Sequence, residues 1–306
     1  VLAVPSYVYV DRVYSRQLAD DRSQALQDLA TATARTLAEN LRERRREIDL
    51  LAETTLFRNA DFSDPELRDS VERLQASYPY YSWIGFSDAT GTVRASANDL
   101  LLGADVSKRP WFGAGLQDSF VGDVHSALLL SKLLPQEPGA GPMRFIDFAA
   151  PVRDKNGDVR GVLAAHAHWR WATDVVKAIA PNLGGPDRVE IFLVNQDNTI
   201  LYPDAEVGKT QLPQSMTAEH GSMMTTWGGS MKYLTAYTAV PEPTTRTPLG
   251  WRVVVRQPAE QALARVNELQ RAFLLGAIVG TIVFLELARW VASASTRPLE
   301  NLSQTA

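Results

Sequence analysis

The stretch MRFIDFAAPVRDKNGDVRGVLAAHAHW, residues 143–169, decides the class of fold. Two runs rich in apolar residues flank the polar segment DKNGD, and an Asn-Gly pair between such runs is a strong signal for an antiparallel hairpin. Asp147 interrupts the first run, and an acid buried there requires a partner. The stretch therefore predicts two paired strands, and it favours a functional role for Asp147 over a purely structural one.

The same strand, turn, strand pattern occurs twice more. YYSWIGFSDATGTVRASA (residues 80–97) has its turn at DATG, and VEIFLVNQDNTILYPD (189–204) has its turn at NQDN. MKYLTAYTAV (231–240) and GWRVVVRQP (250–258) predict further strands, and a Pro- and Gly-rich break, APNLGGPDR (180–188), separates the two sets. This weak internal repeat predicts two copies of one mixed module with antiparallel sheets.

Helical patterns surround the strands. From Asp11 to about Phe57, apolar residues recur at close to 3.6-residue spacing without a Pro or Gly, which predicts one long N-terminal helix. SDPELRDSVERLQASYP (63–79) predicts a shorter helix with Ser63 as its N-cap, and WATDVVKAIA (171–180) predicts another. The expected fold class is α+β.

The C-terminal stretch AFLLGAIVGTIVFLELARWVA, residues 272–292, predicts a transmembrane helix. Its rise of about 31 Å matches the hydrocarbon core of a bilayer, although a buried helix of a soluble protein is the alternative. Gly276 and Gly280 have the GxxxG spacing that allows close helix approach, so we expect a homodimer in the membrane. Residues 1–10 are apolar but too short to span a bilayer. We expect them to be the end of a truncated first membrane helix, and the alternative is an apolar start to a soluble helix.

Composition excludes several classes of function. The chain has 306 residues, a net charge of −4 and no cysteine. The negative charge gives no general attraction to nucleic acid, which is not expected as a partner. The absence of cysteine excludes disulfides and thiolate metal sites but leaves the compartment open.

The order of these elements resembles the double Cache (dCache) sensors of bacterial membrane receptors. The resemblance covers about residues 11–260 and rests on the long first helix, on VSKRPWFGAGLQ (106–117, similar to the family's R-x-W-[YF] element) and on GDVRGVLAAHAHW (157–169, similar to its G-x-[LV]-x-x-D element). It implies two PAS-like mixed α/β modules, a ligand in the membrane-distal one, and a sensor domain in the periplasm anchored in the inner membrane.

The segment after the membrane helix, TRPLENLSQTA (296–306), resembles the start of a HAMP linker. GDVHSALLLSKLLP (122–135) and RFIDFAAPV (144–152) resemble sensor modules that are joined to diguanylate cyclases. The expected output is therefore a diguanylate cyclase outside this chain, or otherwise a histidine kinase or a chemoreceptor. The expected division of the chain is the end of a first membrane helix (1–10), the long helix (11–60), the distal module (61–180), the proximal module (181–258), the juxtamembrane and transmembrane helix (259–293), and the start of the linker (294–306).

The family match also suggests the ligand-binding residues. The R-x-W-[YF] element corresponds to Arg109, Trp111 and Phe112, where a guanidinium suits a carboxylate and an indole can stack on a flat or cationic ligand. The alternative is that Trp111 packs in the core and Arg109 points outward. The full expected set consists of aromatic, acidic and histidine side chains from the helix and the nearby strands: Tyr81, Trp83, Arg109, Trp111, Phe112, Asp123, His125, Asp147 and His166.

Three positions depart from the amino-acid-binding pattern of the family. His166 occupies the position of the aspartate that binds the ligand's amine, His125 that of a tyrosine, and Ala127 that of another aspartate. An imidazole has no fixed negative charge. An ordinary α-amino acid is therefore not the favoured ligand, and purines, amines and carboxylates stay open as ligand classes.

Other functions have weaker support. His125, His166 and His168 suggest a metal site, but no cysteine or Glu-x-x-His motif accompanies them, so no metal or other cofactor is expected. SFVGDVHSA (119–127) places Ser, Asp and His close together, which leaves a membrane-anchored hydrolase as an alternative, yet triads assemble across a fold rather than by adjacency. A ligand-free adhesion or scaffold domain is the third possibility. His220 is expected in a loop, and the chain itself is expected to be a sensor rather than an enzyme.

Overall fold

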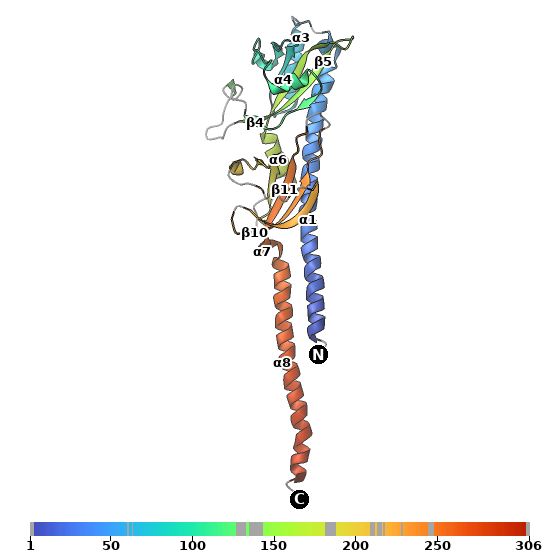
Figure 1. Cartoon of the computed structure of the whole chain (residues 1–306), viewed down its shortest axis with the longest axis vertical. Helices are drawn as coiled ribbons and strands as arrows, with labels where there is room; N and C mark the ends of the chain where they lie inside the picture. The colour runs from blue at the N-terminus through green and yellow to red at the C-terminus, as the bar shows by residue number, and fades with distance from the viewer. Residues whose placement is uncertain are drawn as a thin grey trace.

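The chain forms an elongated molecule built on one long helix (Figure 1). The computed structural model describes residues 3–59, 61–62, 64–126, 133–134, 143–180, 188–208, 212, 216, 218–227, 229–243 and 248–303. Helix α1 (Ala3–Ala52) runs beside two sheets in succession, and helix α8 (Ala264–Ser303) leaves the second sheet in the direction away from the first. The alternation of helices with antiparallel sheets confirms the α+β class. Ala127 and the last residues of the linker segment, 304–306, lie outside the described residues.

Helix α1 supplies one wall of both cores. Leu26 and Leu37 are buried along the helix, and so is Ile48 near its end, as their spacing predicts. The helix ends at Ala52 rather than near Phe57, and a separate helix α2 (Thr55–Arg58) follows. Thr54 causes this break, because its backbone is extended and its hydroxyl donates to the Leu51 carbonyl at 2.8 Å.

The first sheet, with the helices around it, forms the distal module. Its strand order is β2-β1-β6-β5-β3, with β4 also paired to β5. Both predicted hairpins of this module, around DATG and DKNGD, are confirmed. The elements are α3 (Pro65–Ser77), β1 (Tyr81–Asp88), β2 (Val93–Ser96), the 3-10 helix η1 (Ala97–Asp99), α4 (Pro110–Gly115), β3 (Phe120–Val121), β4 (His125–Ser126), β5 (Arg144–Arg153), β6 (Val159–His168) and α6 (Arg170–Ile179).

The second sheet forms the proximal module, next to α8. Its order, β8-β7-β11-β10-β9, repeats that of the first sheet position by position, so that the predicted repeat is confirmed as a repeat of topology. The elements are β7 (Glu190–Val194), β8 (Ile200–Tyr202), the 3-10 helix η2 (Asp204–Glu206), β9 (His220–Thr226), β10 (Lys232–Ala239), β11 (Arg252–Pro258) and α7 (Ala259–Ala262).

Two local predictions were wrong. His220 begins the edge strand β9 rather than lying in a loop. The prediction failed because the strand HGSMMTT is mostly exposed and lacks the apolar alternation by which strands are recognised. Helix α3 has Asp64 as its N-cap in place of Ser63, and the Asp64 side chain accepts from the backbone N–H of Glu66 at 2.9 Å. Pro65 then occupies the first helical position, where no N–H is needed.

Helix α8 contains the predicted membrane segment. Within the described residues, Ala264–Ser293 is the one helix that is long and apolar enough to cross a membrane, and its apolar window is exposed in the structure. Side chains such as Leu275 and Phe284 are mostly exposed on it. Strand β11 leads directly through α7 into α8, so the proximal sheet and this helix form one continuous path.

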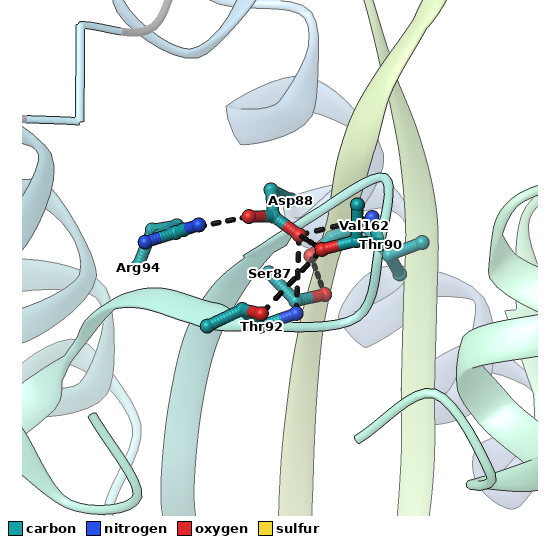
Figure 2. A network of polar contacts seen from close by, with 6 residues as sticks. All are labelled: Ser87, Asp88, Thr90, Thr92, Arg94 and Val162. Carbon is teal, nitrogen blue, oxygen red and sulfur yellow. Dashed lines mark hydrogen bonds and ion pairs between the residues drawn. The ribbon is translucent and has the colours of Figure 1, made fainter. Parts of the chain in front are cut away.

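The turn between β1 and β2 is held by a single carboxylate (Figure 2). Asp88 accepts from the backbone and the hydroxyl of Thr90 at 2.9 and 2.5 Å, from the Thr92 N–H at 3.1 Å and from Arg94 Nε at 2.6 Å. Burial alone would raise the pKa of Asp88, but these hydrogen bonds outweigh it and lower the pKa to about 2. The charged carboxylate therefore stabilises the hairpin that borders the distal core.

We expect Asp88→Asn to lower the free energy of unfolding by about 1.5–3 kcal/mol at neutral pH, the usual loss for hydrogen bonds to a charged group. Because the pKa of Asp88 is lower in the folded than in the unfolded chain, this stabilisation is complete above the ordinary pKa of about 3.9 and is lost as the pH falls toward 2. Urea unfolding at pH 7 and pH 3 measures both effects. The control is Asp158→Asn in an exposed part of the DKNGD turn, and equal losses in the two variants would contradict the assignment.

Candidate functional site

A cavity opens in the distal module between helix α4 and the sheet. Its volume is about 290 Å³, close to the lower end of the range for small-molecule pockets. Its walls combine apolar groups with a few converging polar ones: Leu101, Ala104, Asp105, Val106, Arg109, Pro110, Trp111, Phe120, Gly122, Asp123, His125, Ser126, Asp147 and His166. Six of the nine sequence-predicted side chains lie in this lining, namely Arg109, Trp111, Asp123, His125, Asp147 and His166.

The start of helix α4 places Arg109 and Trp111 on different parts of the cavity. Arg109 has extended backbone just before the helix, and Pro110 occupies the first turn. Trp111 is only 3% exposed, so it both lines the cavity and belongs to the core. Arg109 lies exposed at the rim, and its guanidinium has no hydrogen-bond or ion-pair partner within the part of the chain that the structure describes. An unpaired guanidinium at a cavity rim is suited to an incoming acceptor.

Asp147 lies at the inner end of the cavity between two histidines. Its Oδ2 is 2.8 Å from His125 Nε2, and its Oδ1 forms a very short contact with His166 Nδ1. Burial alone would raise the pKa of Asp147, but the two imidazoles outweigh it and hold the pKa well below its usual range. The contact with Asp147 in turn raises the pKa of His125 against the effects of burial and of Arg109. The predicted partner of the buried acid is thus a pair of histidines.

Aromatic rings back this polar cluster. The His166 ring lies 5.1 Å from the ring of Trp83 and 5.8 Å from that of Trp111, measured between centroids. Trp83 and Phe112 are buried in the core behind the cavity wall, and neither is part of the lining. Their role in this structure is to hold Trp111 and His166 in place.

Tyr81 lies elsewhere. Its hydroxyl donates to Glu47 of α1 at 2.8 Å, and its ring packs in the core between α1 and the sheet. Tyr81 and Trp83 are two residues apart, so a regular strand would place them on the same face. The pairing of β1 with β6 shifts register between these two residues, and this irregularity turns Tyr81 to the other face. The expectation that Tyr81 contacts the ligand is therefore not supported by its position.

Asp123 connects the cavity to the proximal module. It lies between β3 and β4 at the edge of the cavity, while its carboxylate accepts from Trp251 Nε1 at 2.8 Å and from Asn195 Nδ2 at 3.1 Å. Trp251 precedes β11, and its ring packs edge to face against Trp169, 5.4 Å away. Asp123 was predicted as an acidic ligand contact, but its carboxylate is occupied by the neighbouring module.

Sequence reasoning missed the apolar rim formed by Leu101, Ala104, Val106 and Phe120. The segment that carries the first of these bends sharply, because Leu101 (φ 65°) and Gly103 (φ 74°) adopt left-handed backbone. Such a bend in DLLLGADV folds an apolar segment over the helix start. In the sequence, Gly103 was the signal that could have predicted this bend.

The neighbouring residues do not assemble into a hydrolytic triad. Ser119 donates to Asp49 at 2.6 Å, whereas His125 pairs with Asp147. His168 is also separate from the cluster, since its Nδ1 accepts from the backbone N–H of Arg170 at 3.0 Å. The motif SFVGDVHSA therefore does not support the hydrolase alternative.

Comparison with solved structures shows the same fold in bacterial sensor domains. The ligand-binding domain of the Pseudomonas aeruginosa PAO1 amino acid chemoreceptor PctB, in complex with L-Arg, is 19% identical with a TM-score of 0.58, covering 79% of this chain and 97% of that one. The ligand-binding domain of the Pseudomonas fluorescens chemoreceptor CtaA, in complex with L-isoleucine, is 16% identical with a TM-score of 0.59, covering 82% and 98%. The extracellular domain of the putative histidine kinase rpHK1S-Z16 is 16% identical with a TM-score of 0.57, covering 78% and 94%.

At the level of sequence, no curated protein matches the chain. A family model described as Cache domain (dCache_1) matches residues 14–266, which include most of α1, both sheets and the start of α8. The match covers most of the chain, and its limits agree with the extent of the two modules. The chain therefore belongs to the Cache domain family, in its double-module form.

Proposed function

We propose that this chain is the periplasmic sensor region, with its membrane helix, of a bacterial inner-membrane receptor that binds a small molecule in the distal module. The single observation that carries the proposal is the cavity of about 290 Å³ in that module, whose lining combines the exposed Arg109 with the histidine-flanked carboxylate of Asp147. Apolar and aromatic walls with a few converging polar groups are typical of small-molecule sites. Two of the similar solved domains are in complex with amino acids, L-Arg and L-isoleucine.

The ligand classes are narrowed by the charges of the cavity. Arg109 suits a carboxylate or another planar acceptor, and Trp111 offers a flat surface. The carboxylate of Asp147 is already paired with two histidines, so it is not free to bind an amine as a lone acid would. A ligand that carries an acidic group and a flat or apolar body fits this arrangement best. Carboxylates without the α-amino acid pattern are therefore the first compounds to screen, before purines and amines.

The signal is proposed to pass from the cavity to the membrane through Asp123. Its hydrogen bonds to Trp251 and Asn195 join the cavity edge to the proximal sheet, and β11 continues through α7 into α8. A ligand changes the position of α8 only if it prefers one of two arrangements of this path. We further propose that α8 leads through a HAMP linker to an output domain, a diguanylate cyclase in the first instance and otherwise a histidine kinase or a chemoreceptor.

A thermal-shift screen of metabolites on the full chain in detergent tests the proposed sensing. A ligand at 100 to 1,000 times its dissociation constant stabilises the protein by about 2.7–4.1 kcal/mol, which is several degrees in melting temperature. Each hit is repeated on Ala104→Trp, a variant whose added ring fills the cavity from its rim. Hits that shift the wild type but not the variant support the proposal. A screen in which every hit shifts both proteins equally would contradict it.

The second proposal concerns assembly. Gly276 and Gly280 lie on one face of α8, and among the described residues no neighbouring atom lies within 4 Å of a Cβ added at either position. We expect Gly276→Cys and Gly280→Cys to form disulfides between two chains in membranes, and we expect Ile278→Cys, about 200° away around the helix, to form few. The chain has no native cysteine, so each variant reports one position only. Equal cross-linking at all three positions, or none, would contradict a dimer on this face.

A further inference from the structure

Three side chains of types that can ligate a metal, from three strands, meet in the wall of the cavity. His125 on β4, Asp147 on β5 and His166 on β6 each offer one donor atom, and all three atoms lie within 4.8 Å of one another. Ligand atoms around a single ion at about 2.0–2.2 Å have separations within this bound. The register of β5 brings the three together, because Asp147 pairs with His166 across the strands.

The donor set is specific in its chemistry. Two imidazoles and one carboxylate with open positions beside them form sites for divalent transition metals such as zinc, nickel, cobalt or iron. Magnesium and calcium prefer all-oxygen ligands and do not suit two imidazoles. All three side chains line the cavity, so the free coordination positions of an ion would face the space proposed for the ligand.

The charge of the cavity favours a dication. Its lining residues include Asp105, Asp123, Asp147 and Arg109, which gives a formal charge of −2 when the imidazoles are neutral, although the Asp123 carboxylate itself bonds to the proximal module. Arg109 opposes a cation at His125, but it lies at the rim, whereas Asp147 contacts both histidines directly. A divalent ion would offset the negative charge of the lining residues.

The surroundings hold the donors in position. Trp83 and Trp111 flank the His166 ring, as described above, and Phe145 lies 6.5 Å away between centroids. These ring contacts restrict the orientation of the His166 imidazole.

We propose that His125, Asp147 and His166 bind a divalent transition-metal ion whose remaining coordination positions open into the cavity. This metal site would lie within the proposed ligand pocket. It rests on the proposed function in one respect: a small ligand supplies the remaining donors of the ion, with its acidic group between the ion and Arg109. His166 occupies the position at which the family resemblance implies an aspartate. An imidazole there would bind a transition metal, whereas the aspartate would bind an amine.

Cobalt and zinc titrations of the full chain, after treatment with a chelator, test this site. We expect one Co²⁺ per chain, with visible absorption that includes imidazole ligation, and displacement by one Zn²⁺. His125→Gln removes the most exposed of the three donors, at 40% side-chain exposure. It should weaken Zn²⁺ binding by more than the 10- to 100-fold typical of losing a supporting contact. The control is His168→Gln on the same sheet, whose Zn²⁺ affinity should equal that of the wild type.

Two further results separate this inference from the proposed sensing function. Arg109→Ala should bind Zn²⁺ at least as tightly as the wild type, since it removes a repelling charge. If the chelated wild type binds an organic ligand through Arg109 but takes up no Zn²⁺ or Co²⁺, the metal site is overturned and the sensing function stands. If the wild type and His125→Gln bind Zn²⁺ equally, the metal site is also overturned. Zn²⁺ binding that depends on His125, with no organic ligand found, upholds the metal site and leaves the sensing of an organic molecule as the failed proposal.

Discussion

Arg109→Ala should weaken binding of the ligand by roughly 10- to 150-fold, the loss of a charge-assisted contact worth about 1.5–3 kcal/mol. The reason is the position of the guanidinium at the rim of the cavity, without a partner in the described part of the chain. Since Arg109 is exposed, its removal leaves the core intact. Titration calorimetry with a hit from the metabolite screen measures the change directly.

The matched control for this variant is Lys108→Ala. Lys108 is also exposed and cationic, and it precedes Arg109 without lining the cavity. Its replacement should change the affinity by less than about threefold, because a screened surface charge contributes little. Unchanged affinity in a folded Arg109→Ala protein, or equal losses in both variants, would show that the ligand is held elsewhere.

The second large effect is expected in Asp123→Asn, which should separate binding from signalling. The neutral amide cannot accept from both Trp251 and Asn195 as the carboxylate does, so the link between the modules is weakened. Coupling free energies between sites are typically 1–3 kcal/mol, or 5- to 150-fold, and we expect most of this coupling to be lost. The affinity for the ligand should change little, because the carboxylate points away from the cavity toward the proximal module.

Hydrogen exchange of β11 measures this loss of coupling. In the wild type, saturating ligand should slow exchange of the β11 amides of Arg252 to Gln257, although this strand lies in the other module. In Asp123→Asn the same strand should show little or no response at equal saturation. Asp197→Asn, an exposed acid in the NQDN turn of the proximal module, should respond as the wild type does. A full response of β11 in Asp123→Asn would place the coupling on another path, such as α1.

Local sequence patterns predicted most of the fold because the turns and the helix faces are encoded over short distances. The DATG, DKNGD and NQDN turns each joined the strands expected of them, and the apolar spacing of α1 corresponds to its buried face. Boundaries failed where a single side chain decides them. The hydroxyl of Thr54 caps the end of α1, and the carboxylate of Asp64 caps α3 in place of Ser63.

The site was only partly predictable, because its assembly depends on register and on contacts between distant segments. The pairing of Asp147 with His166 follows from the alignment of β5 with β6, which no local pattern reveals. The register shift between Tyr81 and Trp83 places on opposite faces two residues that a regular strand would carry on one face. Asp123 was recognised as an important acid, but its partner Trp251 lies in the other module, far along the chain.

The most direct test of the central claim is the electron density of a crystal structure with the bound ligand. The account predicts density inside the distal cavity, with a polar group of the ligand within hydrogen-bond distance of Arg109 and its body against Trp111. Density in the proximal module instead, for example in the hollow beside Arg256 and Phe192, with the distal cavity unchanged, would contradict it.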